Sequence, residues 1–231
     1  MELLDGLNCY KADAEFWNFT SRLERDAERV MELIQSFGPL PSEDALLKAH
    51  SLLVEIELWK AGCIEELTGN YAIRNLRSAV WNALRDAAVA MRANRDVEAL
   101  LAIMRLEGFG KYPDEDNRRR AKRASAVLRI INPYEWGVVD WRTAAMWGFL
   151  DRCGWDLSQA VDAAKKEDEN NLRRTFDVIN EDEASAYNQT YRDKRSGSLP
   201  RAADVEMAIF GLSSMAWPWR SMSKIARKPV A

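Results

Sequence analysis

One acidic residue stands in an apolar frame where it could do chemistry. Asp140 follows two valines in the segment 137–142, which reads GVVDWR. A carboxylate that is fixed in apolar surroundings can act as a general base or stabilise a developing positive charge. The same side chain is suited to cap a helix that begins at Trp141, and the two roles are compatible. These residues alone therefore leave both a catalytic carboxylate and a purely structural cap open for Asp140.

A basic cluster lies just before this segment. Residues 117–129 carry six basic residues and no acid, although the whole chain has a net charge of −3. A local basic surface can bind phosphate groups in a protein that is acidic overall. A solvated helix face is the ordinary alternative, but the absence of interleaved acids favours binding. At helical spacing, Lys122 and Arg129 fall on one face beside the apolar stripe. The basic residues are Arg118, Arg119, Arg120, Lys122, Arg123 and Arg129.

A Gly-x-Gly turn precedes the basic cluster. Gly108, Phe109 and Gly110 directly follow a pattern that predicts an apolar helix. Two glycines around one apolar residue allow a tight turn with exposed backbone amides, and such a turn before a helix can hold a phosphate. An ordinary connection between two helices is the alternative.

The elements that must position these residues are predicted to be helices. Apolar residues recur at helical spacing between Gly, Pro and capping residues. We therefore predict an all-α fold, a single unit over residues 1–231 with two packed helical lobes. Its helix-hairpin-helix core covers about 97–146, with flanking helices in 15–92 and 156–213 and a frayed tail over 220–231. The expected helices cover residues 16–37, 43–60, 72–92, 97–104, 118–131, 141–153, a stretch beginning at 156 or 158, 182–194, and a final helix with Pro200 in its first turn.

Composition excludes several classes of site. Cys9, Cys63 and Cys153 are far apart and form no zinc or iron–sulfur pattern, and His50 is the only histidine. No glycine-rich nucleotide motif occurs, so we expect chemistry from carboxylates or lysines, with no metal and no cofactor. No apolar run approaches a membrane span and residues 1–17 lack a signal-peptide pattern. We expect a cytoplasmic protein, associated with the nucleoid if the source is a bacterium.

Taken in order, these pieces resemble the helix-hairpin-helix DNA glycosylases related to endonuclease III. The resemblance rests on residues 106–110 (LEGFG), 124–128 (ASAVL), 132–133 (NP) and 138–140 (VVD). In that family a Leu-x-Gly-x-Gly hairpin binds the DNA backbone, and a helix of small and apolar residues follows. An essential Asp then ends a Pro-Val-Asp-like segment, and Asp140 falls on that position.

The resemblance implies a DNA N-glycosylase that extrudes a damaged or modified base from double-stranded DNA and excises it. Asp140 would stabilise the sugar cation and activate water, and Lys122 would be the amine for a Schiff base. The protein is expected to act as a monomer. The residues expected to contact the DNA backbone are Gly108, Phe109, Gly110, Lys111, Arg118, Arg119 and Arg142. Those expected to line the base pocket are Tyr134, Trp136 and Trp141.

Two departures from the family pattern keep other functions open. Residues 111–117 are inserted between the hairpin and the second helix, and Lys122 matches the family's lysine only after a one-residue shift. Lys111 and Arg123 are the other candidates for that position. The alternatives are a catalytically inactive DNA-binding or damage-sensing protein of the same fold, and an all-helical interaction protein. Repair of the cell's own DNA and attack on foreign modified DNA both fit the sequence.

Overall fold

The computed structural model describes residues 1–61, 71–110, 121–176 and 178–218. Within these ranges the regular structure is helical, apart from an isolated bridge between Ser196 and Leu199, so the all-α prediction is confirmed. None of the helices described is both long and apolar enough to cross a membrane. The helices are α1 (Leu3–Lys11), α2 (Ala14–Phe37), α3 (Glu43–Ala61), the 3-10 helix η1 (Ala72–Arg74), α4 (Arg77–Arg92), α5 (Asp96–Met104), α6 (Lys122–Ile131), α7 (Trp141–Arg152), α8 (Leu157–Ala164), α9 (Glu169–Thr175), α10 (Glu181–Asp193) and α11 (Ala202–Ala216).

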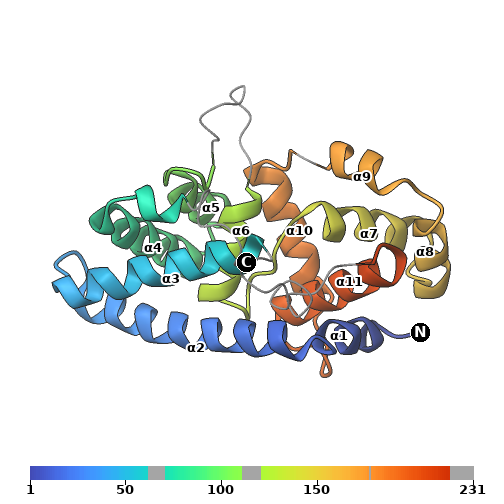
Figure 1. Ribbon diagram of the computed structural model, residues 1–231, viewed down its shortest axis with the longest axis horizontal. Helices are drawn as coiled ribbons and strands as arrows, with labels where there is room; N and C mark the ends of the chain where they lie inside the picture. The colour runs from blue at the N-terminus through green and yellow to red at the C-terminus, as the bar shows by residue number, and fades with distance from the viewer. Residues whose placement is uncertain (62–70, 111–120, 177, 219–231) are drawn as a thin grey trace, which may run out of the picture.

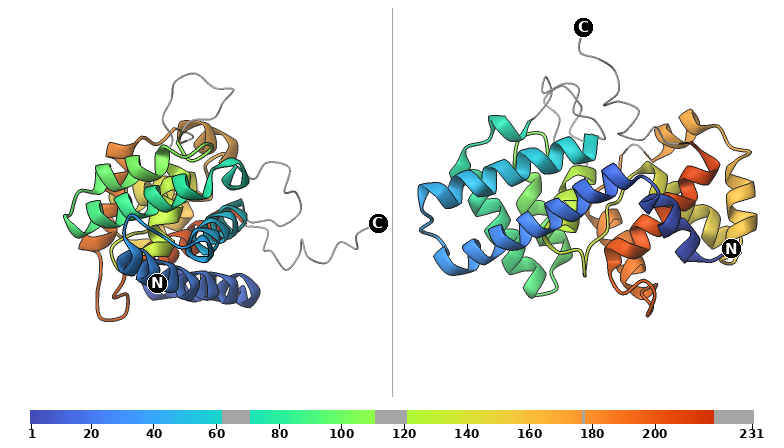
Figure 2. Two further views of the ribbon diagram at one scale, coloured as in Figure 1. Left: turned by 90° about the vertical axis from the view of Figure 1, so that its left-hand side faces the viewer. Right: turned by 60° about the horizontal axis from the view of Figure 1, so that its bottom comes forward.

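The helices lie in two groups along an elongated molecule. Figure 1 shows α2 to α6 at one end and α7 to α11, together with α1, at the other. The long helix α2 packs against α3 and α6, while α11 packs against α1, α7, α8 and α10. The second view of Figure 2 shows the blue α1 lying against the red α11. The two groups meet at several places, among them the ion pairs of Lys60 with Asp140, Asp96 with Arg192 and Glu24 with Arg201.

Two glycines allow α1 to pack closely on α11. A Cβ on Gly211 would overlap the carbonyl oxygen of Gly6, and a Cβ on Gly6 would overlap the carbonyl oxygen of Ala208. No side chain fits at either position, so the two helix backbones approach each other directly. This packing brings the ring of Tyr10 on α1 to 5.8 Å from the ring of Phe210 on α11.

Capping side chains start two helices where the sequence indicated. The Ser42 hydroxyl accepts a hydrogen bond from the Ala45 N–H at the start of α3. The Asp156 carboxylate accepts one from the Gln159 N–H at the start of α8. The helix starts expected at 43 and at 156 or 158 are confirmed, because a cap needs only a polar residue and the few amides that follow it.

Other helix predictions need correction. Residues 72–92 do not form one helix, since η1 ends at Arg74 and α4 begins only at Arg77. Pro200 lies just before Arg201, the cap residue of α11, rather than in the first turn. Apolar patterning predicts neither α1 nor α9, because α1 contains Gly6 and Asn8 and α9 has Leu172 as its only apolar residue.

The basic cluster does not form one exposed face. Lys122 begins α6, but Arg129, two turns further on, is fully buried. The Arg129 guanidinium lies 2.6 Å from a carboxylate oxygen of Glu24 and 5.4 Å from the ring centre of Trp59. An arginine enclosed in this way belongs to the core, so the predicted face that combines Lys122 with Arg129 is wrong.

Candidate active site

The segment before α7 is fixed by hydrogen bonds from two helices. The Val139 N–H donates to the Ser125 hydroxyl on α6 at 3.0 Å. The Val138 carbonyl accepts from the Tyr191 hydroxyl on α10 at 3.1 Å. These bonds satisfy buried backbone groups of an irregular segment, as a buried chain requires. They also hold Asp140, the next residue, in a defined place.

Asp140 caps α7 with one oxygen and turns the other toward α3. Its Oδ1 accepts from the Arg142 and Thr143 N–H groups at 2.9 and 3.2 Å. The Thr143 hydroxyl accepts from the Asp140 N–H at 3.0 Å, which completes a capping box. The Asp140 Oδ2 accepts a hydrogen bond from Lys60 Nζ at 2.9 Å. The predicted cap is therefore confirmed. Asp140 Oδ2 takes no part in the capping.

Lys60, in the last turn of α3, is the cation beside Asp140. The two side chains are 19% and 16% exposed, so the ion pair is largely shielded from water. Shielded charges attract one another more strongly than exposed charges and are screened less by salt. The pair therefore links the two groups of helices at the site.

The carboxyl of Asp140 is held in its ionised form. Burial alone would raise its pKa, but the charge and hydrogen bond of Lys60, the Thr143 N–H and the charge of Arg142 together lower the pKa below its ordinary value. Asp140 is therefore negatively charged at neutral pH. This is the state that a general base or a cation-stabilising group needs.

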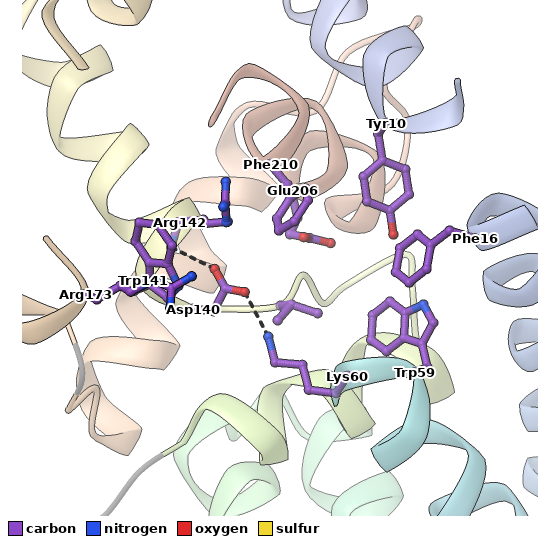
Figure 3. Close-up of a pocket in the computed structure, with 11 residues that line it drawn as sticks. Tyr10, Phe16, Trp59, Lys60, Asp140, Trp141, Arg142, Arg173, Glu206 and Phe210 are labelled. Carbon is purple, nitrogen blue, oxygen red and sulfur yellow. Dashed lines mark hydrogen bonds and ion pairs between the residues drawn. The ribbon is translucent and has the colours of Figure 1, made fainter. Parts of the chain in front are cut away.

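Asp140 and Lys60 line a cavity of about 180 Å³ (Figure 3). Phe16 and Trp59 form an aromatic wall of this cavity, with ring centres 5.8 Å apart and planes 9° from parallel. The Trp59 indole N–H donates to the Thr20 hydroxyl at 2.8 Å, which anchors the wall. A flat aromatic wall near a carboxylate suits a planar ring attached to a centre that gains positive charge. The other lining residues are Tyr10, Val138, Trp141, Arg142, Arg173, Glu206 and Phe210.

Glu206, on α11, is a second acid in the cavity wall. Burial raises its pKa to about 8 against the opposing charge of Arg129, and the negative charge of Asp140 acts in the same direction as burial. At neutral pH the cavity therefore holds one ionised and one protonated carboxyl. Two acids whose pKa values are pushed apart by their surroundings can take different chemical roles.

Two arginines lie on the other side of the ion pair. Arg142 is buried, donates to the Trp217 carbonyl at 2.7 Å and lies 3.5 Å from a Glu169 oxygen. Arg173 is 55% exposed, lies 3.0 Å from the same Glu169 oxygen and stacks over the ring of Trp141 at 5.0 Å. The two arginines share the single carboxylate of Glu169, which leaves an excess positive charge at this edge of the cavity. Such an edge is suited to an anion such as a phosphate.

The structure brings three of the predicted site residues together. Asp140, Trp141 and Arg142 all line the cavity. For Arg142, however, the predicted phosphate contact does not fit its surroundings, because its guanidinium already binds the Trp217 carbonyl and Glu169 inside the protein. Arg173, which the sequence analysis does not single out, is the more exposed arginine there.

Three other predicted site residues lie outside the cavity lining. Trp136 is fully buried and has no free ring face, so its predicted contact with a base is not supported. Tyr134 is 62% exposed and is not among the lining residues. Lys122 stands at the start of α6, and Lys60 instead occupies the place beside Asp140.

The Gly-x-Gly turn is present, and its glycines have a structural reason. Gly108 has a φ of +80°, and a Cβ there would overlap the Tyr71 side chain. Phe109 is buried, so any contact of this residue with DNA would come from its backbone. A Cβ on Gly110 would lie 2.5 Å from the Met104 carbonyl oxygen. Three predicted DNA contacts lie outside the described residues: Lys111, Arg118 and Arg119.

Neither metal-ligand clusters nor known relatives identify the site. No group of three or more His, Cys, Asp or Glu side chains that could hold a metal ion occurs in the part of the chain that the structure describes. Comparisons with protein-family models, curated proteins and solved structures find no match to this chain. Its function must therefore be argued from the site itself and from the sequence resemblance.

Proposed function

We propose that this protein is a DNA N-glycosylase, which excises a damaged or modified base from double-stranded DNA. The observation that carries the proposal is a partly buried, ionised carboxylate, Asp140, beside a cavity with an aromatic wall. The order of sequence features around Asp140, which resembles that of the endonuclease III-related glycosylases, gives further support.

Asp140 would act on the sugar of the extruded nucleotide. Cleavage of a glycosidic bond passes through a sugar with oxocarbenium character, which a nearby carboxylate stabilises. Two backbone N–H groups fix Oδ1, so the carboxylate is already oriented before DNA binds. The base leaves with the electron pair of the broken bond and takes a proton from solvent. Water then forms a bond to C1′ and gives a proton to Asp140, which releases it to solvent.

The aromatic wall would receive the base. Extruding a nucleotide costs a few kcal/mol, and stacking on an aromatic ring can return about 1–3 kcal/mol per base. Phe16 and Trp59 are each only 5% exposed, and the base would stack on the part of these rings that faces the cavity. Arg173 lies at the same cavity and would meet a phosphate of the flipped nucleotide.

Lys60, rather than Lys122, is the amine that supports a further lyase step. Once deprotonated, Lys60 Nζ could condense with the C1′ aldehyde of the abasic sugar, forming a C–N double bond and releasing water. Its position 2.9 Å from Asp140 Oδ2 puts it beside the group that acts on C1′. The resulting Schiff base would allow elimination of the 3′ phosphate.

Incubating the protein with a panel of duplexes, each carrying one damaged or modified base, tests the glycosylase proposal. The assay scores released base and alkali-labile sites. We expect release from at least one duplex, and a loss of about 100-fold or more in Asp140→Asn. Asn is also a good helix cap, so this variant should keep α7 and its affinity for DNA. Binding without release by the wild-type protein would favour a damage-sensing protein, and neither binding nor release would favour an interaction protein.

Borohydride trapping tests the lyase step separately. Reduction of the Schiff base to a secondary amine leaves a covalent protein–DNA adduct. We expect this adduct for the wild-type protein and none for Lys60→Arg, which keeps a cation beside Asp140 but supplies no nucleophilic amine. Lys122→Arg is the matched control and should still be trapped. An adduct that persists in Lys60→Arg and disappears in Lys122→Arg would instead identify Lys122 as the Schiff-base amine, as the sequence resemblance implies.

A further inference from the structure

Glu206 takes no part in the hydrolysis proposed above, yet its carboxyl lines the same cavity. Figure 3 shows it beside Phe210 and Tyr10, across the cavity from Lys60 and Trp59. The residue is only 4% exposed, so protein encloses it almost completely. An acid in such a position interacts with whatever fills the cavity.

The charges around Glu206 balance without it. Glu24 lies 2.6 Å from Arg129 and 2.8 Å from Arg201, and Asp204 lies 2.7 Å from Arg201. Two arginines are therefore matched by two carboxylates. Glu206 is 3.8 Å from Arg129 Nε, beyond hydrogen-bond distance, and is the surplus acid of this cluster. This distant contact, with an arginine that also pairs with Glu24, does not offset the burial of Glu206, and burial favours the protonated form of the acid.

The remaining neighbours of Glu206 do not change this conclusion. Lys60 is already paired with Asp140, and burial raises the pKa of the Tyr10 and Tyr191 hydroxyls, which stay neutral. Burial likewise raises the pKa of Glu206 to about 8, so its carboxyl carries a proton at neutral pH. The groups that act on it come from α1 (Tyr10), α3 (Lys60), α6 (Arg129), the start of α7 (Asp140) and α10 (Tyr191).

We propose that Glu206 determines base specificity by donating its carboxyl proton in a hydrogen bond to an acceptor atom on the edge of the extruded base. The inference rests on the glycosylase function proposed above. Glu206 lines the cavity and is otherwise enclosed by protein, so its carboxyl can meet a ligand only from the cavity. A protonated carboxyl has one O–H donor, which needs an acceptor in a buried site.

The substrate class follows from this donor. The favoured base is planar and presents a carbonyl oxygen or an unprotonated ring nitrogen toward Glu206. A base that presents an N–H group at that point would leave two donors facing each other. Leaving a buried polar group without its partner is the strongest source of discrimination between similar ligands.

Base release at a series of pH values tests the proposal, on the duplex that the wild-type protein processes. Single-turnover rates are compared for the wild type, Glu206→Gln, Glu206→Ala and the matched surface variant Glu135→Gln. We expect Glu206→Ala to lose about tenfold at pH 7, because the donor is gone. Glu206→Gln should stay close to the wild type, because its amide supplies an N–H donor, and Glu135→Gln should be unchanged. Above about pH 8 the wild type should lose activity as Glu206 ionises, whereas Glu206→Gln should not.

The outcomes separate this inference from the function on which it rests. Equal release by Glu206→Ala and the wild type across the pH range would overturn the inference alone, as would the same alkaline loss in Glu206→Gln as in the wild type. Absence of release from every duplex by the wild-type protein would overturn the glycosylase proposal and this inference with it. Thermal unfolding shows which variants are folded. If Glu206→Ala is not folded, the inference is tested by the activity of Glu206→Gln above pH 8 compared with that of the wild type.

Discussion

The ion pair between Asp140 and Lys60 sets the lower pH limit of the proposed reaction. Lys60 is the main group that lowers the pKa of Asp140, against burial, which raises it. Replacing Lys60 with Met leaves burial unopposed by this cation, so the pKa of Asp140 should rise. We expect the acid limb of base release to move to higher pH in Lys60→Met. Single-turnover rates between pH 4 and pH 8 measure it, and an unmoved acid limb would show that another group controls the protonation of Asp140.

Glu206 makes the stability of the protein fall as the pH rises. Its pKa is about 8 in the folded protein, well above the ordinary value for a glutamate. Between these two values the folded chain binds a proton that the unfolded chain has lost, so the free energy of unfolding decreases by up to about 1.4 kcal/mol per pH unit. The contribution is greatest in acid and is lost as the pH rises toward 8.

Glu206→Gln should remove this slope. Thermal unfolding of the wild type and the variant between pH 5 and pH 8 measures the difference, and the variant should gain stability relative to the wild type as the pH rises. A constant difference across this range would mean that Glu206 does not carry a proton in the folded protein.

Of the residues at the site, only those near Asp140 in the chain could be predicted from the sequence. The Val-Val-Asp pattern and the following helix are local, so the cap formed by Asp140 follows from them, whereas its cavity is completed by α1, α2, α3 and α11. Lys60 is 80 residues away in the chain and reaches Asp140 only through the packing of α3 against the site. Arg129 shows the converse error, because a run of basic residues does not indicate which one will meet Glu24 in the core.

At the scale of elements, the close packing of α1 on α11 is the contact most sensitive to the addition of a single methyl group. A Cβ on Gly211 would overlap the Gly6 carbonyl oxygen, so Gly211→Ala forces the helices apart. We expect a loss of about 1–3 kcal/mol in the free energy of unfolding, the usual cost of overpacking. Because α1 carries Tyr10, the cavity should also be disturbed.

Gly148→Ala is the matched control for that change. Gly148 lies within α7, and a Cβ there would meet no atom within 4 Å. Alanine is the better helix former, so this variant should be more stable by about 0.5–1 kcal/mol. Urea unfolding of both variants tests the account, and equal effects of the two substitutions would contradict the close contact between α1 and α11.

Helices with strong caps or long apolar periods could be predicted from the sequence, and those without could not. Ser42 and Asp156 mark helix starts through bonds within a few residues. The break between η1 and α4 has no such signal, because the Asn75 side chain at the break bonds to the backbone of Glu107, which is 32 residues away in the chain. The helix-hairpin-helix motif and the two-lobe arrangement remain predictions, since residues 111–120 lie outside the described ranges.

At the scale of the whole molecule, the proposed binding of DNA would depend on local charge. The net charge of −3 repels DNA overall, so each well-placed cation counts. Arg173→Ala should weaken binding to duplex DNA and reduce the slope of log affinity against log salt by about 1. Arg29→Ala, which also removes an exposed arginine paired on its own helix, is the control and should leave the slope unchanged. Equal slopes for all three proteins would exclude Arg173 from the DNA interface.

The most direct test of the central claim is the rate of base release by Asp140→Asn under single-turnover conditions, with DNA affinity measured on the same preparation. If Asp140 acts on the sugar, release should fall by about 100-fold or more while affinity for the duplex stays within about threefold of the wild type. Release at the wild-type rate by a variant that binds normally would contradict the assignment of Asp140 and, with it, the proposed chemistry of the site.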